Sequence, residues 1–171
     1  MSTEQDKLNT YQQELGSIHS GAVSIVERAY DDVVWTVDRQ KSLDVLTWLK
    51  GKGFDLLLDI NGVDGLNLGR AERFEVVYIL YSIADNLRLR VKVFLPESDL
   101  NLPTVTGLWQ SANWAEREVF DMFGVNFEGH PNLKRILTHH EFEGHALRKD
   151  YPVMGEQWCS STRDMMDDLN E

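Results

Sequence analysis

Residues 87–95 carry the strongest structural signal in the sequence. Apolar side chains occupy alternate positions and are separated by Arg88, Arg90 and Lys92, which is the pattern of a β-strand with one buried and one solvated face. The earlier run from Phe74 to Tyr81 is apolar on both faces, so we expect a central strand that is covered at least partly on both sides. Two long strands of this kind place a sheet at the centre of the fold.

Shorter patterns predict the elements around these strands. The expected elements are a helix with the stripe Leu8, Tyr11 and Leu15 that ends near Gly16, a strand pair at 22–28 and 33–37, a helix with the buried stripe Leu43, Leu46 and Leu49 that stops at 51–53, a strand at 54–60 followed by a turn at 61–65, a loop bracketed by Pro96 and Pro103, and one or two helices within 104–124.

This order of elements is α+β rather than a strict alternation of strand and helix. We therefore expect a single domain with a mixed, mostly antiparallel sheet, helices mainly on one face and an extended C-terminal segment. Residues 1–153 would form the domain. Residues 154–171 contain five acidic residues and one arginine, so they are expected to be an acidic C-terminal tail or docking arm.

Charge and hydropathy exclude several classes of protein. The 28 acidic and 17 basic residues give a formal charge of −11, which repels phosphate backbones and makes a nucleic-acid binder an unattractive interpretation. The longest apolar run, Val76 to Tyr81, is far shorter than a membrane span. The first residues lack the pattern of a signal or transit peptide, so we expect the chain to stay in a cytoplasm.

Familiar catalytic and cofactor motifs are not complete in this sequence. Cys159 is the single cysteine, so the chain cannot supply the thiolates of an iron–sulfur cluster. Residues 51–53 lack the further residues that a nucleotide-binding loop requires. A stand-alone metal-dependent hydrolase using His139, His140, Glu141 and His145 remains a remote alternative, although the spacing does not match a zinc helix.

The helix expected at 113–124 contains two residues that break its pattern. Ala115, Val119, Phe120, Met122 and Phe123 share one side, and Arg117, Glu118 and Asp121 share the other. Glu116 projects into the apolar side, where we expect it to be a strut paired with Arg135 or Arg148; the alternative is a functional acid. Trp114 projects from the polar side and Trp109 lies near it, so another protein is expected to cover this helix.

The residues of this helix also carry a family resemblance. Residues 114–125 read WAEREVFDMFGV, and with the following GHP and RIL they resemble the signature of one NADH-quinone oxidoreductase subunit family, that of the 30 kDa subunit of respiratory complex I. Residues 145–152, HALRKDYP, resemble the second signature of that family, although Ala146 replaces the usual proline. The matching residues, for which structural or docking roles are implied, are Trp114, Glu116, Arg117, Glu118, Asp121, Phe123, Gly124, His130, Pro131, Arg135, His145, Arg148, Lys149, Asp150, Tyr151 and Pro152.

The resemblance implies a non-catalytic core subunit of the peripheral arm of a proton-translocating NADH:quinone oxidoreductase. It would pack against the hydrogenase-like subunit of the quinone site and support electron transfer, with no catalytic, cofactor-binding or metal-binding residue of its own. FMN and the iron–sulfur clusters would reside in partner subunits, and the chain would be peripheral on the cytoplasmic side of the inner membrane. The alternative is the homologous subunit of a membrane-bound hydrogenase or a photosynthetic-type quinone oxidoreductase.

Overall fold

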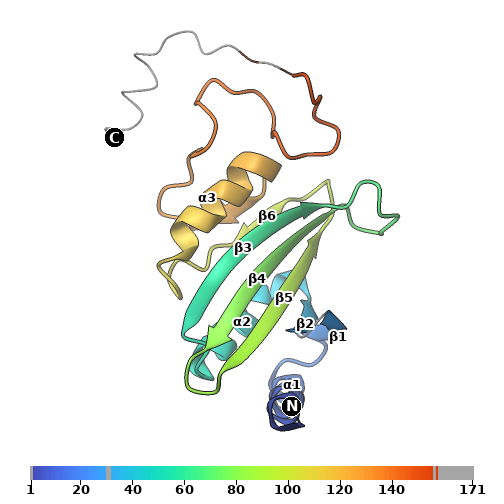
Figure 1. Ribbon diagram of the computed structural model, residues 1–171, viewed down its shortest axis with the longest axis vertical. Helices are drawn as coiled ribbons and strands as arrows, with labels where there is room; N and C mark the ends of the chain where they lie inside the picture. The colour runs from blue at the N-terminus through green and yellow to red at the C-terminus, as the bar shows by residue number, and fades with distance from the viewer. Residues whose placement is uncertain (1, 30–31, 156, 158–171) are drawn as a thin grey trace.

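The computed structural model describes residues 2–29, 32–155 and 157 of the 171-residue chain (Figure 1). Its elements in order are α1 (Ser2–Ile18), β1 (Val23–Ala29), β2 (Asp32–Val37), the short 3-10 helix η1 (Arg39–Lys41), α2 (Ser42–Gly51), β3 (Leu56–Asp64), β4 (Phe74–Ser82), β5 (Leu87–Leu95), β6 (Asn101–Pro103), α3 (Ala112–Phe123) and β7 (Asn126–Glu128). Among the described residues, no helix is both long enough and apolar enough to span a membrane.

A five-stranded sheet with the order β1-β2-β5-β4-β3 forms the centre of the molecule. Its neighbouring strands are antiparallel except for β2 and β5, which run parallel. The short strands β6 and β7 pair in parallel as a separate ladder. The predicted α+β fold with a mixed, mostly antiparallel sheet is confirmed.

The two faces of the sheet differ as the alternation in residues 87–95 predicts. Val76, Tyr78 and Leu80 of β4 belong to the hydrophobic core together with Val91 of β5 and Trp35 of β2. These side chains pack beneath the helices because their neighbours on each strand point the other way. The helices therefore lie mainly on one face, as predicted.

The opposite face carries the basic row of β5, and acidic side chains neutralise it. The ammonium of Lys92 lies 3.1 Å from the carboxylate of Glu75 on β4, and the guanidinium of Arg90 lies 2.7 Å from that of Asp32 on β2. Arg88 is more exposed and lies 3.8 Å from Asp32. The row is thus a cross-strand ion-paired surface and not an open phosphate-binding stripe.

Several expected boundaries were wrong by a few residues. Helix α1 continues past Gly16 to Ile18. In α2, Leu43 is exposed while Val45 is buried, because the buried stripe is shifted by two positions. The segment between Pro96 and Pro103, expected to be a loop, contains strand β6, which pairs with β7.

Strand β3 also runs through the turn that was expected at residues 61–65. The strand continues to Asp64, and Gly62 lies where the ring of Phe123 approaches the backbone so closely that a Cβ atom would overlap it. The glycine therefore serves close packing against α3 and not a turn. The indole Nε1 of Trp109 donates to the carbonyl of Phe54 (3.1 Å), which fixes the chain leading into α3 against the same edge of the sheet.

Candidate functional site

Helix α3 has the buried face that its sequence predicts. Val119, Met122 and Phe123 are buried, while Ala115 and Phe120 are half-buried. The helix ends at Gly124, whose φ of +79° is the left-handed conformation that favours glycine at this position. This end of α3 lies under the chain that follows β7, which Figure 1 shows in orange beside the helix.

The segment of residues 130–155 supplies the partners of the last carbonyls of α3. Ring nitrogen Nδ1 of His145 lies 2.9 Å from the carbonyl oxygen of Asp121, the backbone N–H of Leu147 donates to Met122 (3.2 Å), and Nε of Arg148 donates to Phe123 (2.7 Å). Carbonyls at a helix C-terminus lack partners within the helix and favour nearby cations. The second signature is therefore the cap of the helix that carries the first.

Asp121 anchors the same segment from the side of α3. Its fully buried carboxylate accepts hydrogen bonds from Arg135 (2.8 Å), from the backbone N–H of Leu137 (2.8 Å), and from the backbone N–H (2.9 Å) and hydroxyl (2.5 Å) of Thr138. Burial alone would raise the pKa of Asp121, but these hydrogen bonds lower it to about 2. The expectation that Asp121 lies on a solvated face is wrong because residues 135–138 cover it.

A second buried carboxylate, Asp64 at the end of β3, binds the far part of the segment. The guanidinium of Arg73 donates to both of its oxygens (3.0 and 2.8 Å), and the backbone N–H of Lys149 donates to one of them (2.8 Å). Arg73 also pairs with Asp150 at 2.8 Å. The hydrogen bonds from Arg73 are the main reason why the pKa of Asp64 falls to about 2. Arg73 had no signal in the sequence that distinguished it from a surface residue.

Glu116 is buried as expected, but its partners differ from the prediction. Its carboxylate accepts from the hydroxyl of Thr104 (2.5 Å) and from the backbone N–H of Val105 (2.7 Å). Within the described residues no ion pair reaches it, since Arg135 binds Asp121 and Arg148 caps α3. Burial raises the pKa of Glu116 to about 7, and the two hydrogen bonds only partly oppose this. The predicted Glu116–Arg strut is wrong.

Trp114 is the exposed aromatic side chain of α3. The residue is 65% exposed, and the guanidinium of Arg117 lies 5.0 Å from the centre of its ring. Arg117 also donates from Nε to the carbonyl of Lys134 (3.0 Å), which holds it beside the indole. Trp109, which we expected to join this surface, is buried instead.

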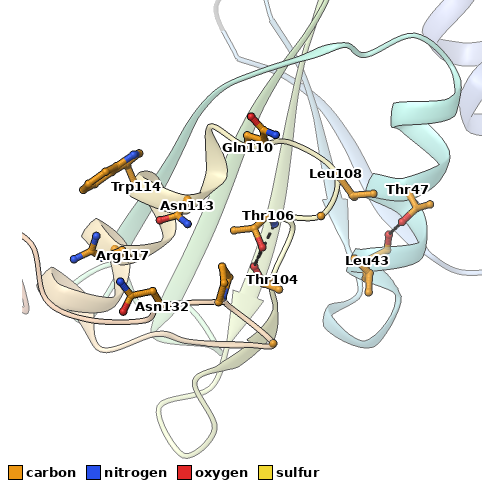
Figure 2. Close-up of a pocket in the computed structure, with 13 residues that line it drawn as sticks. Leu43, Thr47, Thr104, Thr106, Leu108, Gln110, Asn113, Trp114, Arg117 and Asn132 are labelled. Atoms are coloured by element: carbon orange, nitrogen blue, oxygen red, sulfur yellow. Dashed lines mark hydrogen bonds between the residues drawn. The ribbon is translucent and has the colours of Figure 1, made fainter. Parts of the chain in front are cut away.

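A groove begins beside Trp114 and extends toward α2. It has a volume of about 1070 Å³ and is lined by residues of α2, of the chain before α3, of α3 itself and of the turn after β7. Figure 2 shows Trp114, Asn113 and Arg117 on one side, Leu43 and Thr47 on the other, and Thr104 and Thr106 between them.

Comparisons with known proteins agree with this arrangement. Residues 35–157 match the family described as respiratory-chain NADH dehydrogenase, 30 Kd subunit. The chain belongs to this family. The 30 kDa subunit family thus includes both signatures and all the buried carboxylates described above.

Individual relatives support the same assignment. NADH-quinone oxidoreductase subunit 5 of Thermus thermophilus is 49% identical over 128 residues, which cover 70% of this chain and 62% of that protein. Another NADH-quinone oxidoreductase subunit, from Burkholderia thailandensis, is 43% identical over 158 residues, covering 87% of this chain and 78% of that protein.

Two solved structures resemble the fold. One is a trypsin-resistant fragment of Nqo5, with a TM-score of 0.65 and 39% identity, which covers 72% of this chain and 98% of the fragment. The other comes from an archaeal membrane-bound sulfane sulfur reductase, with a TM-score of 0.71 and 26% identity over 87% of each chain.

The remaining signature residues of this 30 kDa family member lie along the same surface. His130 is half-buried, with Nε2 3.1 Å from the carbonyl of Asn113, while Glu118, Pro131 and Pro152 are exposed. The ring of Tyr151 stacks on that of Phe142 with a centroid distance of 5.6 Å.

The histidine-rich part of the 130–155 segment does not assemble a metal site. In the described part of the chain, no group of three or more His, Cys, Asp or Glu side chains is placed to hold a metal ion. His145 faces the end of α3, where burial lowers its pKa, and His139 contacts the ring of Phe142 edge-on. Cys159 and most of the acidic tail lie outside the described residues.

Proposed function

We propose that this chain is a non-catalytic core subunit in the peripheral arm of a proton-translocating NADH:quinone oxidoreductase, and that it packs against the hydrogenase-like subunit of the quinone site. The observation that carries this proposal is how the signature residues are used. Asp121, His145, Arg148 and Lys149 hold the 130–155 segment against α3 and β3, while Trp114 remains exposed. Such residues build a rigid surface, which an electron-transfer complex needs in order to keep its carriers at fixed spacing.

The cofactors of the reaction would then lie in other chains. We propose that FMN and the iron–sulfur clusters are held by partner subunits and that this chain contacts the membrane only through the complex, on the cytoplasmic side of the inner membrane. Residues 1–153 would form the folded domain, and residues 154–171 would be its acidic tail or docking arm. The names of the relatives from Thermus and Burkholderia support this placement.

A related respiratory complex is the second candidate. The similarity to a chain of the archaeal membrane-bound sulfane sulfur reductase covers 87% of this chain, so the same fold serves in a complex with different chemistry. A membrane-bound hydrogenase or a photosynthetic-type quinone oxidoreductase belongs to this second candidate. The identity of the subunits that co-purify with the chain separates the two candidates.

The test is purification of the native assembly through a tag on this chain, with identification of every co-purifying chain. We expect the subunits of an NADH:quinone oxidoreductase, including the hydrogenase-like subunit. Trp114→Ala should lower the recovery of these partners at least tenfold, because exposed tryptophans that become buried in an interface are typical binding hot spots. The melting temperature of the isolated chain should change little, since the side chain is mostly exposed.

Leu137→Ala is a matched control because Leu137 is similarly exposed, at 62%, but lies outside the groove. It should leave partner recovery near the wild-type level. Purification of the chain alone would contradict the proposed function, and recovery of hydrogenase or sulfur reductase subunits would favour the second candidate.

A further inference from the structure

The groove beside Trp114 differs in charge from the rest of the chain. The chain has 28 acidic and 17 basic residues, yet Arg117 is the single charged residue among those that line the groove. The acidic residues Asp44 and Glu128 adjoin it in sequence without lining it. A binding partner would therefore meet a local positive charge on an otherwise acidic protein.

The groove also combines apolar and hydrogen-bonding side chains. Leu43, Trp114 and Pro131 supply apolar surface, while Gln110 and Asn113 supply amide groups that can bind a peptide backbone (Figure 2). A lining of this kind suits an extended polypeptide that alternates apolar and polar contacts.

The walls of the groove are held in place by buried interactions. Thr104 and Val105 are fixed by Glu116, and the hydroxyl of Thr106 lies 3.0 Å from that of Thr104. On the other side, Arg117 donates to the carbonyls of Lys134 and Arg135 at 3.0 and 3.2 Å. A preformed groove loses little entropy when a ligand binds.

The orientation of Arg117 indicates which charged group the groove can accept. Its guanidinium lies over the indole of Trp114, and in the part of the chain that the structure describes no carboxylate pairs with it. Arginine binds carboxylates with good geometry, and stacking on an aromatic ring fixes its plane.

We propose that the groove binds an extended segment of another protein chain that carries an aspartate or glutamate next to an apolar side chain. The carboxylate pairs with Arg117 and the apolar side chain packs on Trp114. This inference rests on the proposed function, because it makes a neighbouring subunit the source of the segment.

The test places a photo-crosslinking amino acid at Asn132, an exposed residue of the groove, in the full chain expressed with its native partners. Mass spectrometry of the crosslinked product identifies the captured peptide. We expect a peptide of another subunit that contains Asp or Glu. Gln110→Glu should lower the crosslinking yield about twofold to fivefold, and Gln110→Lys should raise it by a similar factor, as for one exposed charge pair.

Gln13→Glu and Gln13→Lys are matched controls, since Gln13 is exposed on α1 at the opposite end of the molecule (Figure 1). Both should leave the yield unchanged. The proposal is overturned if no other chain is captured, if the captured peptide lacks an acidic residue, if it comes from residues 158–171 of this chain, or if the yield ignores the charge at position 110.

The same experiment distinguishes this inference from the proposed function. Co-purification of the NADH:quinone oxidoreductase subunits without an acidic crosslink would overturn the groove proposal and leave the proposed function standing. An acidic crosslink to a chain outside such a complex would support the groove and overturn the proposed function.

Discussion

The buried carboxyl of Glu116 should make the stability of this protein depend on pH. Its folded-state pKa is about 7, above the ordinary value of 4.5, because burial disfavours the charged form. A raised pKa means that folding favours the protonated carboxyl. The contribution to stability is therefore fully present below about pH 4.5 and is lost as the pH rises through about 7.

The size of this effect follows from the two pKa values. A tenfold change in a protonation equilibrium corresponds to about 1.4 kcal/mol, so a rise from 4.5 to about 7 amounts to about 3 kcal/mol. Glu116→Gln keeps the shape and an oxygen that can accept from Val105, but it cannot ionise. Relative to wild type, the variant should gain about 3 kcal/mol of unfolding free energy between pH 5 and pH 8.5.

Urea unfolding at several pH values measures this difference. Comparing the variant with wild type removes the opposing contribution of His145, whose lowered pKa favours folding at higher pH. Glu118→Gln is the control, because Glu118 is exposed on the same helix, and its difference from wild type should stay constant. The reasoning is refuted if Glu116→Gln is about 3–5 kcal/mol less stable than wild type at every pH, which is the result for a buried ion pair that loses one partner.

Two further substitutions test the packing around α3. Asp121→Asn should lower the unfolding free energy by about 3 kcal/mol and speed tryptic cleavage after Arg135, because it removes the charge that Arg135 binds; unchanged cleavage would show that the segment is held by other contacts. Gly62→Ala should cost about 1–3 kcal/mol because its Cβ would overlap Phe123, whereas Gly107→Ala, with no atom within 4 Å, should stay within about 0.5 kcal/mol in the same assay.

Regular periodicity made much of the sheet and of α3 predictable from sequence. The alternation around Arg88 and Lys92 placed one face of β5 in the core, and the cross-strand acid Glu75 was anticipated as a partner. The apolar stripe of α3 likewise identified Val119 and Met122 as buried. Such patterns report local burial, because side chains on one face of an element share one environment.

The contacts of the candidate site depend on tertiary structure that a single sequence does not encode as a pattern. Asp121 belongs to the polar side of an isolated helix, and residues 135–138 cover it only after the chain folds back. Glu116 was correctly identified as buried, but hydrogen bonds from Thr104 and Val105 replace the expected arginine. Periodicity identifies which side chains are buried and does not identify what they touch.

The parallel pair of β2 and β5 has a consequence for how this chain folds. Val33 lies beside Leu89 and Trp35 beside Val91, so the centre of the sheet closes only when two distant parts of the chain meet. Loops of that length slow folding compared with the local β4–β5 hairpin. During synthesis, the apolar side of the β1–β2 hairpin has no partner until β5 has been made, and exposed strands of this kind are prone to aggregate. The early translated part of this chain is therefore expected to need protection by a chaperone.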